Sequence, residues 1–313
     1  MKKSIILFAS FIMLATLASC NKETAAPDNS HDIVADKTLI EFKALNDAGE
    51  DFNPSVQTKA TAAVTTLSSF NVTATTGTPG STTAGTLEKA AFSSAAFTGT
   101  SSFTGSKYWP ATDPSYHFYA ANATIAGTDG TASAAGAYTV AATNTTDIVC
   151  AYLASPTYGS SNALTFNHIF ARVGYCKITE SNGYTVSGLT CKITPKTGGT
   201  YNIRTGAGEA AGGYAGTGWS NTTTGAAVTL CSATGSTTDN GLYLVPGTYT
   251  LTTTFTLSRG DFSKSYTKTN SVNIQKGKIN NITGTINVDD AADMTFTVSV
   301  AEWGTNAIAV TIS

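Results

Sequence analysis

The cysteine at position 20 is the residue whose surroundings point most directly to chemistry. The chain begins Met-Lys-Lys, continues with the apolar run "SIILFASFIMLATLAS" to Ser19, and turns polar directly after Cys20. A charged start followed by a short apolar run is typical of a secretory signal peptide, and the run is too short for a permanent transmembrane helix. We therefore expect residues 1–19 to direct export and then to be removed.

Residues 17–20, Leu-Ala-Ser-Cys, resemble the lipobox of bacterial lipoproteins. Small residues at positions 18 and 19 fit a protease cleft, and the Cys20 thiol would accept a diacylglyceryl group before cleavage. Each buried methylene of an acyl chain contributes about 0.8 kcal/mol, so a multiply acylated Cys20 is a firm membrane anchor. The alternative is an ordinary signal peptide that ends near a cysteine by chance.

Residue types suited to catalysis are few. The three histidines are His31, in a polar tail, and His117 and His168, each inside a strand-like segment. The chain contains no G-x-S-x-G elbow, no H-E-x-x-H pair and no phosphate-binding G-x-x-x-x-G-K-[ST] loop. Residues 206–211, "GAGEAA", fit a dinucleotide-binding pattern literally, but a Gly-rich stretch follows, so we expect a flexible loop there. We predict no enzyme activity and no cofactor.

A possible metal site lies in the segment "NVDDAAD" at 287–293, which contains Asp289, Asp290 and Asp293. Three carboxylates could bind calcium, but dedicated calcium sites assemble six to eight oxygen ligands. A solvated turn between strands explains the segment better, and we predict no bound metal.

Four cysteines remain after Cys20: Cys150, Cys176, Cys191 and Cys231. An even number in an exported chain permits two disulfides, with three possible pairings. Free cysteine is also a common small core residue, so buried free thiols are equally compatible with the sequence. Because no C-x-x-C spacing occurs, a zinc or redox motif is not indicated.

Tryptophans offer the only hint of a small-ligand site. Trp109 lies in "SKYWPATDPSYHFYA" and Trp219 in the Gly-rich "GYAGTGWSNTT". An exposed indole face can stack on a sugar ring, whereas a buried one contributes to the core of a β-domain. The sequence favours the core role for both and leaves glycan binding as an alternative.

Composition predicts a chain made almost entirely of strands. Only 12% of residues are charged and the net charge is −2, so no basic surface is available for nucleic acid. Thr and aromatic residues favour strands, and Gly marks the turns between them. Short strands separated by Gly, Asn and Ser predict β-sandwiches.

Particular segments specify which faces are buried. In the polar tail at 20–59, residues 38–45 alternate, with Ile40, Phe42 and Ala44 on one face, as in a half-buried strand. Residues 147–153, "DIVCAYL", are apolar on both faces, which suits a central strand. Along 249–257, every second residue is apolar except Thr253. We expect the side chains of this alternating set, Tyr249, Leu251, Thr253, Phe255 and Leu257, to face the core.

A cluster of Pro, Gly and Ser at 155–162 is the best candidate for a domain boundary. It divides the chain into an N-terminal sandwich at 60–158 and a C-terminal sandwich at 163–313. The chain ends in two further alternating segments, within 294–313. Their apolar positions are Phe296, Val298 and Val300, and then Ile308, Val310 and Ile312.

The order of several segments resembles the fimbrillin-like lipoproteins of type V pili in Gram-negative anaerobes. These segments are the lipobox, "TKATAAVTTLSSFNVTA", "SKYWPATDPSYHFYAANA", "LTFNHIFARVGYCKIT" and the final "VAEW". The similarity runs over nearly the whole chain. It implies two transthyretin-like β-sandwich domains in tandem and a fibre-forming or fibre-associated role.

The resemblance also implies a mechanism for the two isolated strand segments. In fimbrillins a trypsin-like protease removes the tail with its first strand, and the C-terminal strands of another subunit fill the exposed groove. Residues 38–45 would be the removable strand and residues 294–313 the donor. The family cleaves after arginine; here Lys59 occupies that place, so Lys59–Ala60 is the candidate bond. An uncleaved tail would instead give a capped anchor.

The function implied is a structural subunit of surface fimbriae that assembles by donor-strand exchange and takes part in adhesion. Expected partners are other fimbrial subunits, the outer membrane through the lipid, and a host or bacterial surface receptor. The alternative is a stand-alone outer-membrane lipoprotein that binds glycans through Trp109 or Trp219.

Overall fold

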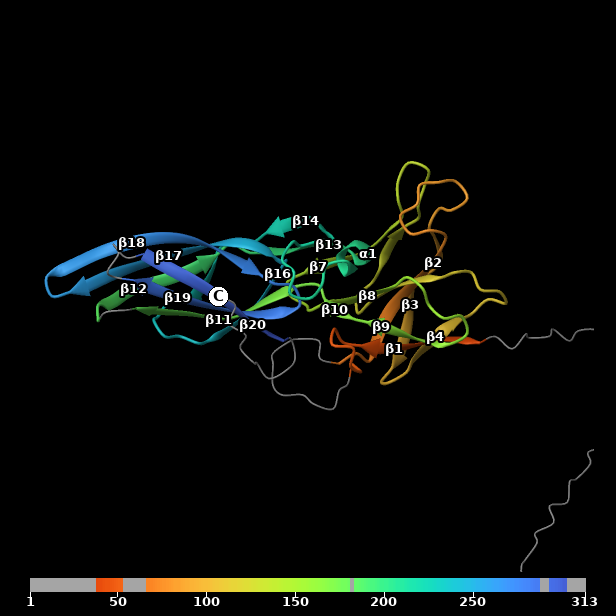
Figure 1. Cartoon of the computed structure of the whole chain (residues 1–313), viewed down its shortest axis with the longest axis horizontal. Coiled ribbons are helices and arrows are strands. Elements are labelled where there is room, and N and C mark those ends of the chain that lie inside the picture. The colour runs from red at the N-terminus through yellow and green to blue at the C-terminus, as the bar shows by residue number, and fades with distance from the viewer. Residues whose placement is uncertain (1–37, 53–65, 181–182, 288–292, 303–313) are drawn as a thin grey trace, which may run out of the picture. The chain divides into compact units, whose positions relative to one another are not determined.

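The computed structural model describes residues 38–52, 66–180, 183–287 and 293–302 (Figure 1). In the last of these ranges, side chains are described only at Ser299 and Ala301. The described residues form twenty strands and one short helix, which confirms the predicted all-β class. The strands pair into four sheets.

The largest sheet contains eight strands, in the order β10-β8-β5-β2-β3-β4-β1-β9. Their bounds along the chain are β1 Leu39–Leu45, β2 Ser69–Thr76, β3 Lys89–Gly99, β4 Phe103–Tyr108, β5 His117–Ala121, β8 Val149–Leu153, β9 Ser161–Thr165 and β10 Asn167–His168. One hydrophobic cluster takes side chains from seven of these strands, including β8 near one end and β9 at the other. The sheet therefore curves around its own core.

A second sheet has the order β14-β13-β7-β6. Its strands are β6 Ala126–Thr128, β7 Ala137–Thr143, β13 Lys196–Asn202 and β14 Trp219–Thr224. The cluster on its inner face combines Tyr138 and Tyr201 from this sheet with Tyr119 and Cys150 from β5 and β8. Strands β5 and β8 are thus buried on both faces, as predicted for the segment 147–153, because each face contributes to a different core.

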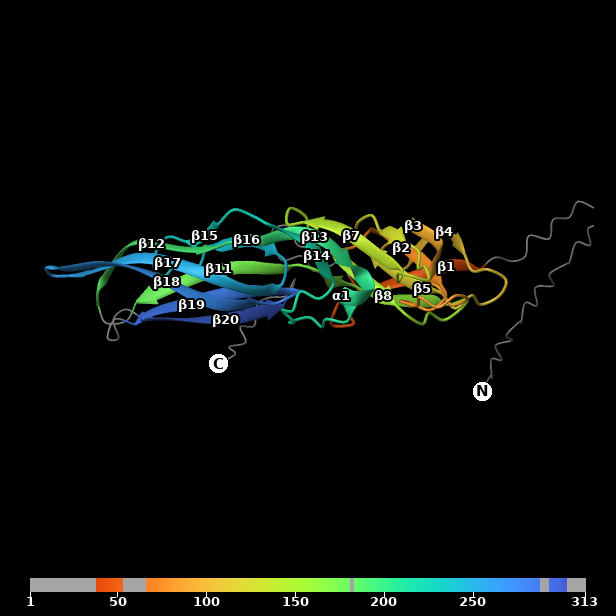
Figure 2. The same ribbon diagram turned by 90° about the horizontal axis from the view of Figure 1, so that it is seen from above.

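The remaining two sheets form a β-sandwich (Figure 2). One has the order β16-β11-β19-β20, with bounds β11 Ala171–Glu180, β16 Asp239–Leu244, β19 Lys278–Asn287 and β20 Asp293–Glu302. The other has the order β15-β12-β17-β18, with bounds β12 Thr185–Ile193, β15 Val228–Cys231, β17 Gly247–Arg259 and β18 Phe262–Ile274. Both contribute to one core. The predicted face of 249–257 is buried within β17.

Strands from both sides of the breaker segment 155–162 pair with one another. Strand β9 begins at Ser161 and adds to the sheet of β1 through a parallel pairing. Strand β7 pairs with β13 over five residue pairs, from Thr143 opposite Gly198 to Thr139 opposite Asn202. The chain therefore returns from the second half to complete sheets of the first.

Helix α1, Ile203–Ala207, was not predicted, because the sequence indicated strands and turns only. The Asn202 side chain caps it by accepting a hydrogen bond from the Thr205 backbone N–H at 2.9 Å. The buried Lys276 ammonium donates to the carbonyls of Gly206 and Glu209, at 2.7 and 3.0 Å. The expected loop over 206–211 is wrong for its first two residues, which belong to α1. No sign of this helix is present in the sequence, because a single capped turn is too short to show a helical pattern.

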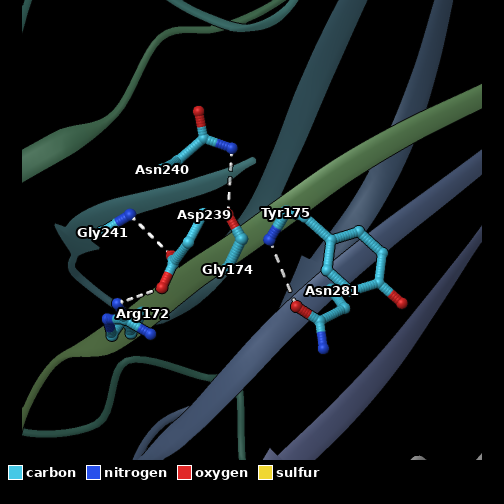
Figure 3. Close-up of polar contacts among 7 residues, drawn as sticks. All are labelled: Arg172, Gly174, Tyr175, Asp239, Asn240, Gly241 and Asn281. Atoms are coloured by element: carbon cyan, nitrogen blue, oxygen red, sulfur yellow. Dashed lines mark hydrogen bonds and ion pairs between the residues drawn. The ribbon is translucent and has the colours of Figure 1, made fainter. Parts of the chain in front are cut away.

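A bulge in β11 shows how polar contacts fix the register of the C-terminal sandwich (Figure 3). The Tyr175 backbone N–H donates to the Asn281 side chain at 3.2 Å, and the Asn240 amide donates to the Gly174 carbonyl at 2.9 Å. A Cβ at Gly174 would lie 2.2 Å from Asn281 Oδ1, so a larger residue would displace the Asn281 side chain from its contact with Tyr175. Next to it, buried Arg172 pairs with Asp239 at 2.6 Å.

The four cysteines predicted as either paired or free are free, buried thiols. Cys191 and Cys231 lie opposite each other in the pairing of β12 with β15. The Cys231 and Cys176 sulfur atoms are 3.7 Å apart across the sandwich core. Burial raises the pKa of the Cys150 thiol. A buried thiol of high pKa has little of the reactive thiolate form.

We expect a Cys20→Ser variant of the chain to react negligibly with a thiol reagent such as Ellman's reagent while it is folded. Four thiols per chain should react after guanidinium denaturation without reductant. A denatured and reduced sample gives the reference value. A count of two or zero before reduction would contradict the free-thiol arrangement.

Candidate functional site

Strand β1 is internal to the eight-stranded sheet, although the sequence places it in a polar tail. It pairs antiparallel with β4, with Phe42 opposite Phe103, and parallel with β9, from Glu41 opposite Ser161 to Leu45 opposite Thr165. Both edges of β1 are therefore occupied by ladder hydrogen bonds. The predicted strand at 38–45 is present and paired.

The inward face of β1 is the predicted one. Ile40 and Phe42 are 0% exposed and Ala44 is 4% exposed. The Phe42 ring makes edge contacts with Phe97 and Phe118, each at 4.9 Å between ring centroids. These contacts place Phe42 inside the aromatic core of the sheet rather than at its margin.

The ends of β1 are also held. The Trp109 backbone N–H donates to the Thr38 carbonyl at 2.8 Å, and the Phe166 N–H donates to the Leu45 carbonyl at 2.8 Å. After β1 the chain turns back, and the Phe52 N–H donates to the Ala44 carbonyl at 2.9 Å. The Phe52 ring lies 6.3 Å from that of Phe166 and belongs to the same core.

The covalent connection of β1 to the rest of the sheet is a single segment. Residues 53–65 lie outside the described residues, and they include both Lys59 and Ala60 of the candidate cleavage bond. This segment leads to β2, which is separated from β1 in the sheet by β3 and β4. A cut within it would leave β1 attached to the sheet by noncovalent contacts alone.

Those contacts are strong enough to matter on the scale of folding. Full burial of a side chain such as Ile40 or Phe42 contributes about 1.5–3 kcal/mol. Each ladder hydrogen bond adds a net ~1 kcal/mol. Removing β1 would expose the aromatic core and leave the facing edges of β4 and β9 without partners. The arrangement can therefore act as a groove that accepts one strand.

The residues that line this groove are not predicted by the sequence. Its lining includes Phe97, Phe103 and Phe118 together with Leu164 and Phe166. Alternation within a segment indicates which face is buried, but it does not specify the neighbouring strand. The nearest signal in the sequence was the accumulation of phenylalanines between residues 92 and 118.

The predicted donor positions are only partly described. Strand β20 pairs antiparallel with β19 along its whole length, and Phe296, Val298 and Val300 lie opposite Gly284, Ile282 and Asn280. It is the end strand of its sheet. The other donor positions, Ile308, Val310 and Ile312, lie outside the described residues, as does Cys20.

The tryptophans proposed for glycan stacking are both engaged in packing. Trp109 is 3% exposed, and its ring lies 5.8 Å from Tyr116 and 5.2 Å from Tyr158. Burial raises the pKa of Tyr116 in this group. Trp219 is half-buried and donates from Nε1 to the Ile169 carbonyl at 3.3 Å. Stacking of a sugar on Trp109 is incompatible with this burial.

Candidates for catalysis and metal binding are not brought together. His168 is buried and paired with Asp147 at 2.9 Å, while His117 bonds the Gly77 carbonyl at 3.0 Å. Asp289 and Asp290 lie outside the described residues. Across the part of the chain that the structure describes, no group of three or more His, Cys, Asp or Glu residues is arranged to hold a metal ion. In those same ranges, no helix has the length and apolar character needed to cross a bilayer.

The fold and the site define an all-β protein in which strand β1 completes the core of a sheet whose other strands come later in the chain. The fimbrillin-like family matches residues 57–303, most of the chain. The chain therefore belongs to the fimbrillin-like family, as its sequence predicts. No curated protein matches it.

Solved structures show more distant similarity. A protein from Bacteroides ovatus proposed to act in cell adhesion is 17% identical, with 86% of this chain and 99% of that chain covered and a TM-score of 0.40. A protein from Parabacteroides distasonis, also proposed to act in cell adhesion, is 10% identical, with coverage of 85% and 100% and a TM-score of 0.41. A fimbrial assembly protein from the same species is 12% identical, with coverage of 85% and 97% and a TM-score of 0.35.

We expect Phe42→Ala to destabilise the full chain by about 3–5 kcal/mol, because it removes a fully buried ring from an aromatic core. Lys43→Ala, at an exposed position of the same strand, should change stability by less than about 0.5 kcal/mol. Urea unfolding of both variants measures the difference. Equal effects would show that β1 does not contribute its side chains to the core.

Proposed function

We propose that this chain is a structural subunit of a cell-surface fimbrium that assembles by strand exchange and contributes to adhesion. In this proposal the protein is exported and lipid-anchored at the outer membrane through Cys20. Cleavage of Lys59–Ala60 frees the tail that carries β1, and a strand from another subunit takes its place between β4 and β9. The observation that carries the proposal is that β1 is a core strand joined to the rest of its sheet by a single covalent connection.

The proposed donor has the pattern that the groove requires. Ile308, Val310 and Ile312 repeat the i, i+2, i+4 spacing of Ile40, Phe42 and Ala44. A strand added to an exposed edge gains ladder hydrogen bonds, and its alternate side chains fill the pockets. The fit differs in detail, because valine is smaller than phenylalanine and isoleucine is larger than alanine. Small shifts of the core side chains would accompany the exchange.

The pairing of β20 with β19 divides the predicted donor region into two parts. Using 293–302 as a donor would break a ten-residue ladder in its own sandwich, whereas 303–313 continues beyond that ladder. We therefore propose that residues 308–312 enter the neighbouring groove and that Phe296, Val298 and Val300 form the rigid base of the donor.

The domain organisation proposed with this function is two transthyretin-like domains in tandem, at 60–158 and 163–313. The C-terminal sandwich, with its single core, supports the second domain. The pairings of β7 with β13 and of β1 with β9 join the two regions, so a domain boundary here would be crossed by shared sheets.

We expect the surface form of the protein to begin at Ala60. Lys59→Gln should leave the tail attached, Lys59→Arg should be processed normally, and Lys43→Gln should behave as the wild type, because a trypsin-like protease requires a cation at the cleaved residue. N-terminal sequencing of protein released from cells distinguishes these outcomes. A mature monomeric protein that still begins at Cys20 would contradict the proposal.

A charge placed in the donor should stop polymerisation only on the face that enters the groove. Val310→Asp would bury an unpaired carboxylate, at several kcal/mol per subunit contact, whereas Thr311→Asp would place it on the opposite face. Electron microscopy and size-exclusion chromatography should show monomers for the first variant and fibres for the second. Fibres from both, or from neither, would exclude residues 308–312 as the exchanged strand.

A further inference from the structure

The turn between the two longest strands of the C-terminal sandwich presents a charged tripeptide. Strands β17 and β18 each contain thirteen residues and pair along their whole length, ending with Arg259 opposite Phe262. The two residues between them are Gly260 and Asp261. The turn therefore displays the sequence Arg-Gly-Asp, and Figures 1 and 2 show it at the outer end of these strands.

The local geometry holds this tripeptide in a defined conformation. Gly260 has a φ of +58° and Asp261 does not have a positive φ, which is the pattern of a type II′ hairpin turn with glycine at its first central position. A two-residue turn on a long ladder has little freedom to change. The tripeptide is thus presented rigidly, which lowers the entropy lost when a partner binds.

Both charged side chains are accessible. Arg259, Gly260 and Asp261 are exposed, and the neighbouring Phe262 is 44% exposed. Among the residues that the structure describes, neither a hydrogen bond nor an ion pair engages the Asp261 carboxylate. Of the three arginines in the chain, Arg172 is buried and Arg204 is half-buried, so Arg259 alone is exposed.

The Arg259 side chain is supported without being neutralised. Its guanidinium carbon lies 5.4 Å from the centre of the Tyr184 ring, and the same ring makes an edge contact with Phe262 at 6.0 Å. Stacking on an aromatic face uses the plane of the guanidinium and leaves its N–H edge free to bind a carboxylate bidentately. An aromatic support next to an exposed cation is typical of a contact surface.

We infer that this turn, defined as residues 259–262, is a recognition site for an adhesion receptor that binds Arg-Gly-Asp. Such a receptor would coordinate the Asp261 carboxylate through a divalent cation and would bind the Arg259 guanidinium with its own carboxylates. This is the chemistry of integrin receptors. The inference names a partner for the adhesive part of the proposed function, and it does not require strand exchange because the turn is complete in a single chain.

The test is surface plasmon resonance with the purified monomeric chain and a soluble integrin ectodomain that binds Arg-Gly-Asp peptides. We expect binding in Mn²⁺, loss of binding in EDTA, and competition by an Arg-Gly-Asp peptide but not by an Arg-Gly-Glu peptide. Asp261→Glu keeps the charge but moves the carboxylate by one methylene, and it should weaken binding by about thirtyfold or more.

Asp47→Glu is the matched control, since Asp47 is an exposed aspartate in another tight turn and should leave binding unchanged. Thermal unfolding should be the same for both variants, because both positions are exposed. No binding in Mn²⁺, binding that persists in EDTA, or equal affinity of the Asp261→Glu variant and the wild type would each overturn the inference. Fibre formation by the Asp261→Glu variant reports separately on assembly, so failure of the receptor site and failure of strand exchange are distinguishable.

Discussion

The burial of Phe42 in the core of the eight-stranded sheet is the interaction on which the proposed biology depends. Its ring contacts Phe97 of β3 and Phe118 of β5, two strands that are not adjacent to β1 in the sheet, so β1 packs across the curved sheet into its core. Because the surroundings of Phe42 are entirely apolar, an empty groove would expose a large hydrophobic surface to water. A protein with this constraint must either keep its first strand or replace it.

The two ends of the chain differ in what they require. The eight-stranded sheet needs a strand between β4 and β9, whereas the C-terminal sandwich already has one complete core. Strand β20 belongs to that sandwich through β19, and further residues follow it. In the proposed assembly, loss of β1 would open a place between β4 and β9, and residues 303–313 of another subunit would fill it. Such complementary, unlike surfaces are the condition for head-to-tail association of identical subunits.

The C-terminal sandwich gains its rigidity from local polar contacts as well as from its core. The β11 bulge is fixed by Asn240 and Asn281, and Gly174 makes room for the second of them. A sandwich with a fixed register gives a defined base to the long β17–β18 hairpin, which carries the turn at 259–262.

The sequence by itself determined the strand class, the inward face of β1 and the two-sided burial of β8, because alternation along an extended chain depends only on residues two apart. It left the state of the cysteines open, and it missed α1 because a single capped turn carries no periodic pattern. The tertiary structure alone decided that β4 and β9 flank β1 and that β13 returns to pair with β7. Those features arise from contacts between residues far apart in the chain, and local side-chain preference carries no information about the partner across a sheet.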